Sequence, residues 1–351
     1  MSDTVKGFNC PIPNYVTGKI LLGHGSGGKL SANLLESIIL PKLKNEILDQ
    51  GHDGAILEFD QTKLAFTTDS YVVSPYIFPG GDIGSLAVYG TVNDLSMCGA
   101  IPKYISLGLI LEEGFSLSDL EQILNSISSS AKKAGVQIVT GDTKVVEKGK
   151  CDGIFINTSG IGIINISVSV NPKNVKPGQL IIINGTIADH GMAILSSREN
   201  LEFETELKSD SSPLNELVNS ILSVYPQVPM MRDITRGGLA SVLNEIADAS
   251  STRIEIDEML IPIKEDVATF CELLGFDPLY VATEGKCVVF ADPDFADDVL
   301  EEMKKLEFGK DSKIIGRVTE KTDDPRLILR TRIGSKRIVD RLPGDQLPRI
   351  C

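Results

Sequence analysis

The sequence predicts a two-domain α/β protein that ends in an extended, flexible tail. Its 351 residues are enough to build two separate hydrophobic cores. Short β-rich runs alternate with helical patterns on both sides of a break at residues 171–178, which contains Asn-Pro and Lys-Pro-Gly sequences. After the last β-rich run, residues 340–351 contain two prolines and one glycine and show neither a helical nor a strand period.

These observations divide the chain into four parts. We expect an N-terminal arm at residues 1–17, an N-terminal domain at 18–170, a C-terminal α/β domain at 171–339 and the tail at 340–351. Fully extended, the tail would span on the order of 30–40 Å. That reach is sufficient to carry its last residue from the protein's own surface to a partner.

Composition disfavours several classes of protein. The net charge of −14 disfavours non-specific binding to nucleic acid. No stretch approaches the ~18 consecutive apolar residues of a membrane span, and residues 1–16 do not resemble a signal peptide. The six cysteines lie far apart without a CxxC pair, and Cys271 and Cys287 stand in apolar surroundings that are typical of packing residues. We therefore expect a cytoplasmic protein that has no disulfide framework and contacts neither nucleic acid nor membrane.

The N-terminal domain opens with a glycine-rich loop. A short strand at 19–22 is expected to precede Gly23-His24-Gly25-Ser26-Gly27-Gly28-Lys29, and Ser31 is expected to cap a helix that continues to Ile39. The loop nearly matches the phosphate-binding pattern GxxxxGK[ST], but Leu30 stands where the hydroxyl should be. It is either a loop that closes over phosphates with Lys29 or a plain glycine-rich turn.

The remaining elements of this domain follow from hydrophobic periods. The expected strands are 55–59, 64–68, 104–111, 136–139 and 154–166, and the expected helices are 83–97 and 118–135. Asp69 follows the second strand, and Asp142 and Lys144 lie in an expected turn after the fourth, where polar residues are well placed to meet a ligand. Asp94 interrupts an apolar helix, where a carboxylate is costly unless it is paired or metal-bound. A capping or hydrogen-bonded structural aspartate is the alternative.

The C-terminal domain repeats the α/β pattern. The expected strands are 180–184, 279–281, 287–290, 314–318 and 326–329, and the expected helices are 239–249 and 295–306. Asp189-His190-Gly191 is placed to open a further helix. The stretch from Arg232 to Gly238 precedes a helix, and its glycines allow backbone amides to face an anion. The three histidines lie apart, so no histidine cluster supports a zinc site.

Four aspartates are candidates for a common site: Asp69, Asp94, Asp142 and Asp233. Carboxylates that face a triphosphate repel it unless Mg²⁺ ions bridge the two sets of oxygens. The pattern therefore favours a site for Mg²⁺ and ATP that lacks a phosphate loop of the usual kind. Scattered structural aspartates are the alternative.

The last residue is a further candidate because it is a cysteine on the predicted tail. A thiol with a pKa of roughly 8.5 is a competent nucleophile and a carrier of acyl-type groups. The adjacent α-carboxylate opposes formation of the thiolate on Cys351, and Arg349 would offset that effect. The alternative is a solvated tail that happens to end in cysteine.

Several ordered motifs make the chain, from about residue 18 to 351, resemble the HypE family of hydrogenase maturation factors. This family lies within the superfamily of aminoimidazole ribonucleotide synthetase and selenophosphate synthetase. The resemblance is carried by His24-Gly25-Ser26-Gly27-Gly28, Thr67-Thr68-Asp69-Ser70-Tyr71, Phe78-Pro79-Gly80-Gly81, Gly141-Asp142-Thr143-Lys144-Val145-Val146, Arg232-Asp233-Ile234-Thr235-Arg236-Gly237-Gly238, Glu284-Gly285-Lys286 and Pro348-Arg349-Ile350-Cys351. The N-terminal arm and Thr283 depart from the family pattern.

The resemblance implies a fold, an activity and partners. The fold is the aminoimidazole ribonucleotide synthetase type, in which the N-terminal mixed sheet forms a β-barrel-like interface of a homodimer. The activity is the ATP-dependent dehydration of an S-carboxamide on Cys351 to a thiocyanate. The carbamoyl group comes from the carbamoyltransferase HypF, and the cyanide passes to iron held by the HypC–HypD complex.

The resemblance also implies roles for individual residues. The residues implied to bind metal are Asp69, Asp94, Asp142 and Asp233. The residues implied to bind nucleotide are Gly25, Ser26, Gly27, Gly28, Lys29, Asn93 and Thr143. Lys144 would act on the carboxamide or the transferring phosphoryl group. Glu284, or less strongly His190, would accept a proton from nitrogen. A structural ion pair between Lys144 and Glu284 is the alternative.

Two other functions are open at this point. Another ATP-using member of the superfamily, such as a small-molecule ligase or a selenophosphate synthetase, needs no terminal cysteine. Selenium chemistry usually also requires a reactive cysteine or selenocysteine near the glycine-rich loop, where His24 stands here. A nucleotide-responsive binding protein, whose tail docks a partner without chemistry, is the second alternative.

Overall fold

The structure is a computed structural model that describes residues 20, 22–25, 27–43, 45–50, 52–59, 62–165, 167–199, 207–342, 347 and 349–351. The N-terminal arm expected at 1–17 and the loop residue Ser26 lie outside the described residues. Residues 19 and 21 of the strand expected at 19–22 lie outside them as well, and Leu22 belongs to a 3-10 turn.

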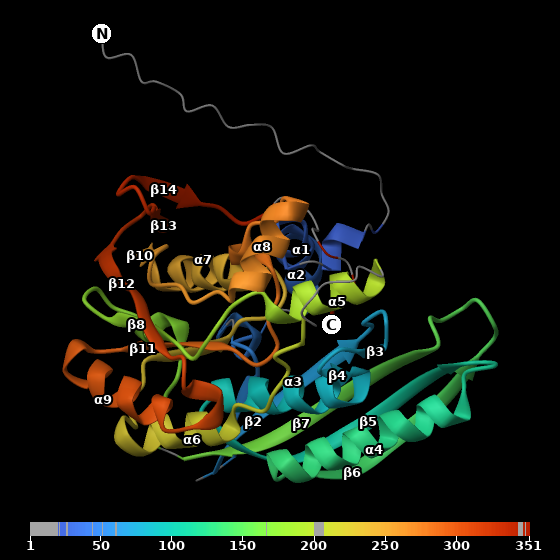
Figure 1. Cartoon of the computed structure of the whole chain (residues 1–351). Helices are drawn as coiled ribbons and strands as arrows, with labels where there is room; N and C mark the ends of the chain where they lie inside the picture. Colours follow the sequence, from blue (N-terminus) through green and yellow to red (C-terminus); the bar gives the residue numbers. More distant parts are fainter. Residues whose placement is uncertain are drawn as a thin grey trace.

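The N-terminal domain is built on a five-stranded mixed sheet with the strand order β1-β2-β7-β5-β6 (Figure 1). Its strands are β1 (Ala55–Phe59), β2 (Thr62–Tyr71), β5 (Ala100–Glu112), β6 (Gln137–Val146) and β7 (Ile154–Ile164). Only β5 and β6 run parallel, which requires a crossover, and helix α4 (Leu117–Ala134) supplies it. The described part of the chain also contains the short hairpin β3 (Ile77–Phe78) and β4 (Gly81–Asp82).

Helix α3 (Ile83–Met97) lies between the two domains and is buried almost along its entire length. Asp82 caps it by accepting hydrogen bonds from the backbone N–H groups of Gly84 and Ser85. The helix packs against β2, β5 and β7 on one side and against β9 and α6 of the C-terminal domain on the other. This double contact explains why its sequence is apolar on all sides.

The C-terminal domain contains a seven-stranded sheet with the order β14-β13-β10-β12-β8-β11-β9. Its strands are β8 (Leu180–Ile183), β9 (Met230–Asp233), β10 (Thr252–Asp257), β11 (Cys287–Ala291), β12 (Lys313–Lys321), β13 (Arg326–Arg330) and β14 (Lys336–Val339). Its helices are α5 (Asp189–Arg198), α6 (Asn215–Val224), α7 (Gly238–Ser250), α8 (Glu265–Leu274) and α9 (Pro293–Lys304). All five residues of β11 are buried, because α9 covers its sheet and β8 and β9 flank it.

The predicted α/β class with two domains is confirmed, and several element boundaries are corrected. Residues 140–145 were expected to form a turn but belong to β6, since pairing with β5 extends the strand to Val146. Residues 279–281 were expected to form a strand, but Pro278–Tyr280 is a 3-10 turn. Helix α1 (Lys29–Leu34) begins before Ser31, whose hydroxyl accepts from the N–H of Gly27. A π-helical turn (Leu35–Ile39) and α2 (Leu40–Leu43) continue it.

The two faces of the N-terminal sheet differ in how they are covered. Helices α3 and α4 lie on one face, whereas the other carries exposed apolar side chains such as Phe66, Ile101 and Ile161. Edge strand β6 is exposed at every residue except Val146. No helix among the described residues is long and apolar enough to cross a lipid bilayer.

Candidate active site

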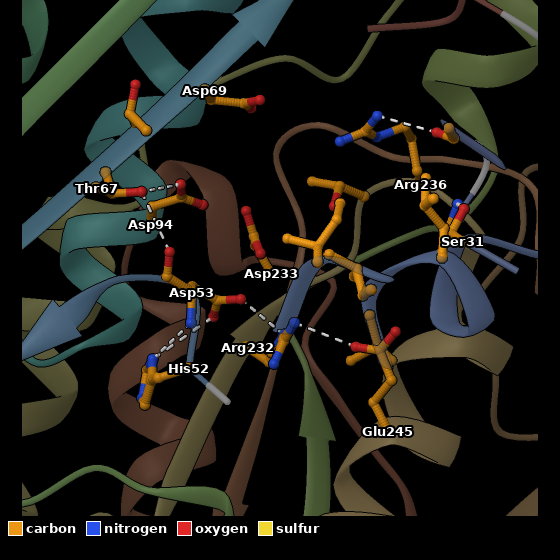
Figure 2. Close-up of a pocket in the computed structure, with 18 of the residues that line it drawn as sticks. Ser31, His52, Asp53, Thr67, Asp69, Asp94, Arg232, Asp233, Arg236 and Glu245 are labelled. Atoms are coloured by element: carbon orange, nitrogen blue, oxygen red, sulfur yellow. Dashed lines mark hydrogen bonds and ion pairs between the residues drawn. The ribbon is translucent and has the colours of Figure 1, made fainter. Parts of the chain in front are cut away.

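A cavity of about 500 Å³ lies between the two domains and is lined by acidic side chains (Figure 2). Strand β2 contributes Asp69, helix α3 contributes Asp94, and the end of β9 contributes Asp233. These residues are far apart in sequence, and the packing of α3 against both sheets brings them to one cavity. Three of the four aspartates that the sequence singled out are therefore neighbours.

The carboxylates of the cavity disfavour one another's ionisation. Burial raises the pKa of Asp94 and of Asp233, and neighbouring carboxylates raise both further. Burial also raises the pKa of Asp69, against a smaller opposing effect of Arg236. Thr67 partly compensates by donating a 2.8 Å hydrogen bond to Asp94 Oδ2.

An oxygen-rich, acidic cavity of this kind fits a hard divalent cation. No group of three His, Cys, Asp or Glu side chains within the described ranges is close enough to hold a metal ion unaided. Mg²⁺ commonly takes one or two carboxylates and completes its shell with water and substrate phosphates. The donor set is therefore suited to magnesium that arrives together with a nucleotide.

Sequence reasoning did not single out Asp53, which also lines the cavity. Its carboxylate lies 2.7 Å from Nε of Arg232, and the same guanidinium lies 3.1 Å from Glu245. Asp53 faces the cavity only because the segment before β1 packs beside β9, so nothing in its sequence neighbourhood marks it. These ion pairs fix the position of the Arg232 guanidinium beside the cavity.

The glycine-rich loop closes one side of the cavity. Arg236 donates a 3.0 Å hydrogen bond to the carbonyl oxygen of Gly25. Gly27 has φ +75°, and a Cβ there would lie 2.9 Å from the carbonyl oxygen of Arg236. The backbone N–H of Lys29 donates to Leu342, at the base of the tail. Glycine at position 27 is thus required both by its dihedral angle and by its close neighbour.

Asp142, Thr143 and Lys144 lie on β6 and are not brought to this cavity within one chain. Asp142 and Lys144 form a 2.5 Å ion pair, and both side chains are 68% exposed. Strand β6 is three positions from β2 in the sheet, a separation of about 14 Å at the usual strand spacing. The pleat also directs Asp142 and Lys144 to the open face, where their β5 partners are Gly108 and Ile110. Lys144 therefore pairs with Asp142 and not with Glu284.

The end of the tail is docked between the domains. The backbone N–H groups of Val72 and Ser74 each donate a 3.2 Å hydrogen bond, to a terminal carboxylate oxygen of Cys351 and to the carbonyl oxygen of Arg349. Ile350 is buried among apolar side chains of both domains. Burial raises the pKa of the Cys351 thiol, and Arg236 opposes this effect. Glu284, Asp69 and Asp233 raise that pKa further, so the charges around the cavity reach the sulfur.

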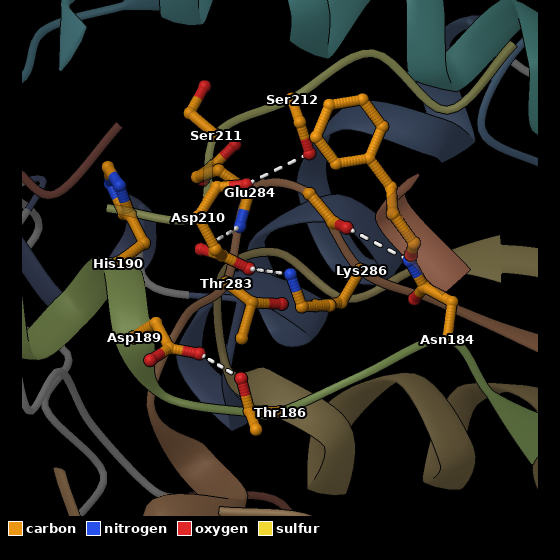
Figure 3. Close-up of polar contacts among 12 residues, drawn as sticks. Asn184, Thr186, Asp189, His190, Asp210, Ser211, Ser212, Thr283, Glu284 and Lys286 are labelled. Carbon is orange, nitrogen blue, oxygen red and sulfur yellow. Dashed lines mark hydrogen bonds and ion pairs between the residues drawn. The ribbon is translucent and has the colours of Figure 1, made fainter. Parts of the chain in front are cut away.

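A buried polar network supports the docked tail (Figure 3). His190 lies 2.7 Å through Nε2 from the carbonyl oxygen of Ile350 and 2.8 Å through Nδ1 from the Ser209 hydroxyl. The backbone N–H of Glu284 donates to Asp210, which is paired with Lys286 at 3.1 Å. The network therefore fixes the backbone position of Glu284.

Glu284 and Asn93 occupy the contact between the domains. Burial and nearby carboxylates raise the pKa of Glu284, and its Oε1 is buried without a hydrogen-bond partner in the described structure. Asn93 donates to the carbonyl oxygens of Ser212 and Glu284 and accepts from the N–H of Leu214. Its amide ties α3 to the C-terminal domain, and a contact with nucleotide remains a prediction.

Comparison with known proteins assigns the family. Two family models match, AIR synthase related protein, N-terminal domain, over residues 51–164 and AIR synthase related protein, C-terminal domain, over residues 176–326. Carbamoyl dehydratase HypE of Cupriavidus necator is 48% identical over the full length of both chains. The chain belongs to the HypE family. HypE of Escherichia coli strain K12 is 41% identical over 95% of this chain and 99% of its own.

Solved structures of HypE proteins have the same fold. A HypE in complex with HypF is 47% identical, with a TM-score of 0.83, and the match covers 88% of this chain and 99% of that one. A HypE in complex with ATP is 42% identical, with a TM-score of 0.79, and the match covers 95% of this chain and 100% of that one. The HypE fold extends to a more distant protein, AaThiL, at 21% identity and a TM-score of 0.68.

Proposed function

We propose that this chain is a carbamoyl dehydratase of [NiFe]-hydrogenase maturation that uses ATP to convert the S-carboxamide on its own Cys351 into a thiocyanate. The cyano group then becomes a ligand of the hydrogenase iron. The docked position of Cys351 carries the proposal, because the residue contacts the N–H of Val72, three residues after Asp69, and the charges of Arg236, Glu284 and Asp69 act on the pKa of its thiol. A cysteine that presents the substrate has to reach the nucleotide site.

The reaction requires activation of the carboxamide oxygen, which is a poor leaving group. In the balanced sequence this oxygen attacks the γ-phosphorus of ATP, ADP departs, and the nitrogen loses one proton. The C–O bond then breaks, phosphate leaves with the oxygen, and loss of the second proton gives the C≡N bond. Carboxamide and ATP thus become thiocyanate, ADP and phosphate. Such transfers depend mainly on positioning and charge neutralisation.

We assign nucleotide and metal binding to the cavity between the domains. Asp69, Asp94 and Asp233 would hold Mg²⁺, which neutralises triphosphate charge and orients the γ-phosphate. The loop from Gly25 to Lys29 would close over the phosphates, and Ser26 is included in this assignment by its place in the loop. The ATP complex of a 42% identical HypE supports the nucleotide.

Glu284 is our candidate for the proton acceptor. Its Oε1 is buried and unpartnered among the described residues, and its raised pKa moves the group toward the range that suits a base near neutral pH. His190 is less suited, because its Nε2 faces the carbonyl of Ile350 and its Nδ1 faces Ser209. We therefore assign His190 to holding the tail.

The open face of the N-terminal sheet supports a homodimer. An exposed edge strand next to a face with Phe66, Ile101 and Ile161 is unusual for a lone chain. We propose that two such faces pack into the barrel-like interface of the superfamily. Asp142, Thr143 and Lys144 would then complete the cavity of the neighbouring subunit, where Lys144 acts on the carboxamide.

We further propose two exchanges with other proteins. HypF would carbamoylate Cys351, consistent with the complex that a 47% identical HypE forms with HypF. The HypC–HypD complex would accept the cyanide. Both exchanges require the tail to leave its docked position, and its length permits this. We propose that these reactions take place in the cytoplasm.

Mass spectrometry of the C-terminal peptide tests the activity. After carbamoylation, addition of ATP and Mg²⁺ should remove one water from the Cys351 peptide, and Cys351→Ala should bind ATP yet give no modified peptide. An intact carboxamide with ATP bound would instead favour a nucleotide-responsive binding protein. ATP turnover by Cys351→Ala with a free small-molecule acceptor would favour a superfamily ligase.

A further inference from the structure

The docked tail is held mainly through its backbone, and a side chain outside the cavity contacts both the tail and the segment beside it. Arg198, the last residue of α5, donates from Nε and Nη2 to the carbonyl oxygen of Ser74 at 3.1 and 2.8 Å. The same Nη2 donates to the carbonyl oxygen of Arg349 at 2.9 Å. Its guanidinium therefore joins the tail to the segment on which the tail lies.

We propose that Arg198 is a positioning residue for the dehydration step. Its side chain clamps the tail in the position at which the Cys351 sulfur lies beside the acidic cavity. The inference rests on the proposed function and adds a residue to it. Charge-assisted hydrogen bonds from a planar guanidinium define geometry as well as affinity. Because the accepting groups are backbone carbonyls, the clamp does not depend on the group attached to the sulfur.

The clamp is suited to repeated release. When the tail leaves, Arg198 loses its bond to Arg349, whereas Ser74, to which it donates twice, belongs to the body of the protein. The guanidinium therefore stays in place to receive the tail again. A side chain that lost all its partners on release would bind water instead, and docking of the tail would have to remove that water at a larger free-energy cost.

A second, weaker contact acts on the same tail residue. Arg349 donates through Nε to the carbonyl oxygen of Val72 at 3.3 Å and forms an ion pair with Asp152. Asp152 is half-exposed, so this pair is screened by salt and contributes less than the bonds from Arg198. Arg198 and Asp152 lie on different domains, and together they hold the tail from both sides.

The first test measures how well the tail shields its thiol. We would follow alkylation of Cys351 by iodoacetamide in the full chain, without nucleotide, by mass spectrometry of the peptide that Asp-N protease releases. Arg198→Met should raise the alkylation rate about tenfold, as expected for loss of a charge-assisted hydrogen bond, and Arg198→Lys by less. Asp152→Asn should raise it about twofold and abolish its dependence on salt.

Arg253→Met is the control, because it also removes a guanidinium, which here pairs with Glu320, but Arg253 lies on β10. It should leave the alkylation rate unchanged. Equal alkylation rates in wild type and Arg198→Met would overturn the proposal. Arg198→Lys keeps the positive charge and an N–H donor, so it reports on the clamp even when Arg198→Met fails to fold.

The second test measures chemistry. In a single turnover with ATP and Mg²⁺, carbamoylated Arg198→Met should lose water about tenfold more slowly than wild type, with partial recovery in Arg198→Lys. Its carbamoylation should not be slower than in wild type. Slow dehydration together with normal shielding of the thiol would also refute the clamp. A wild-type protein that never loses water would refute the proposed function, while the alkylation test would still decide on the clamp.

Discussion

The Nε2 atom of His190 lies 2.7 Å from the carbonyl oxygen of Ile350, the residue before the terminal cysteine. A carbonyl only accepts hydrogen bonds, so Nε2 carries the proton and Nδ1 of the neutral ring accepts from Ser209. Burial lowers the pKa of His190, which favours this neutral form. The imidazole is thus a strut between the C-terminal domain and the tail.

The protonation state of His190 predicts a dependence of stability on pH. Its native-state pKa is lowered, so below about pH 6.5 the unfolded chain takes up a proton that the native chain does not. The stabilisation by His190 is therefore complete above that pH and declines as the pH falls toward the native-state pKa. His190→Asn should cost about 1–3 kcal/mol at pH 7.5. Urea unfolding should show this difference shrinking at pH 5.5, and a constant difference would contradict the assignment.

The acidic cavity predicts opposite effects of one substitution on stability and on binding. Raised carboxyl pKa values mean that the native state disfavours the ionised forms, so Asp94→Asn removes a penalty and keeps an acceptor for Thr67. The midpoint of thermal unfolding without ligand should rise by roughly 2–4 °C. Calorimetry should find binding of Mg-ATP weakened. Asp324→Asn, in an exposed ion pair with Arg326, is the control and should change neither quantity.

The proposed sharing of the site across a dimer predicts complementation. Asp94→Asn and Lys144→Ala homodimers should each be inactive. After unfolding and refolding together, half of the dimers carry one intact site, so roughly a quarter of wild-type dehydration should return. If each chain used its own β6, every site in the mixture would be damaged and activity would stay absent. Co-refolding Asp94→Asn with Asp233→Asn is the control, because both lesions affect the same half of the site.

The close approach of the glycine-rich loop to Arg236 predicts an effect of Gly27→Ala. Alanine at φ +75° costs about 1–2 kcal/mol, and its Cβ would be forced against the Arg236 carbonyl. The loop would move away from its position against Arg236, and the dissociation constant for ATP should rise about tenfold. Gly114→Ala, at φ +92° in open space, carries similar dihedral strain and should leave ATP affinity unchanged. Equal affinities for wild type and Gly27→Ala would show that the loop does not close on the nucleotide.

Local sequence predicted much of the fold, because many elements have a strong hydrophobic period. Helix α3 begins and ends as predicted, at Ile83 and Met97, and its uniformly apolar character correctly indicated burial. The sequence missed β6 beyond Val139, since Thr140, Gly141 and Asp142 are typical of a turn and only pairing with β5 makes them a strand. Other elements were also missed or misassigned: strands β9, β10 and β14, helices α6 and α8, and the 3-10 turn at Pro278–Tyr280.

The sequence by itself determined the family and the α/β class and singled out the acidic residues and the terminal cysteine that we propose as the carrier, because motifs and periods are local properties of the chain. Only the tertiary structure decided which of these groups meet. It gathers Asp69, Asp94 and Asp233 around α3, adds Asp53, and leaves Asp142 on the opposite face of the sheet. It also docks the tail through backbone atoms and through Arg198, which no motif marks. Distances between remote segments depend on how sheets and helices pack, and no local pattern encodes them.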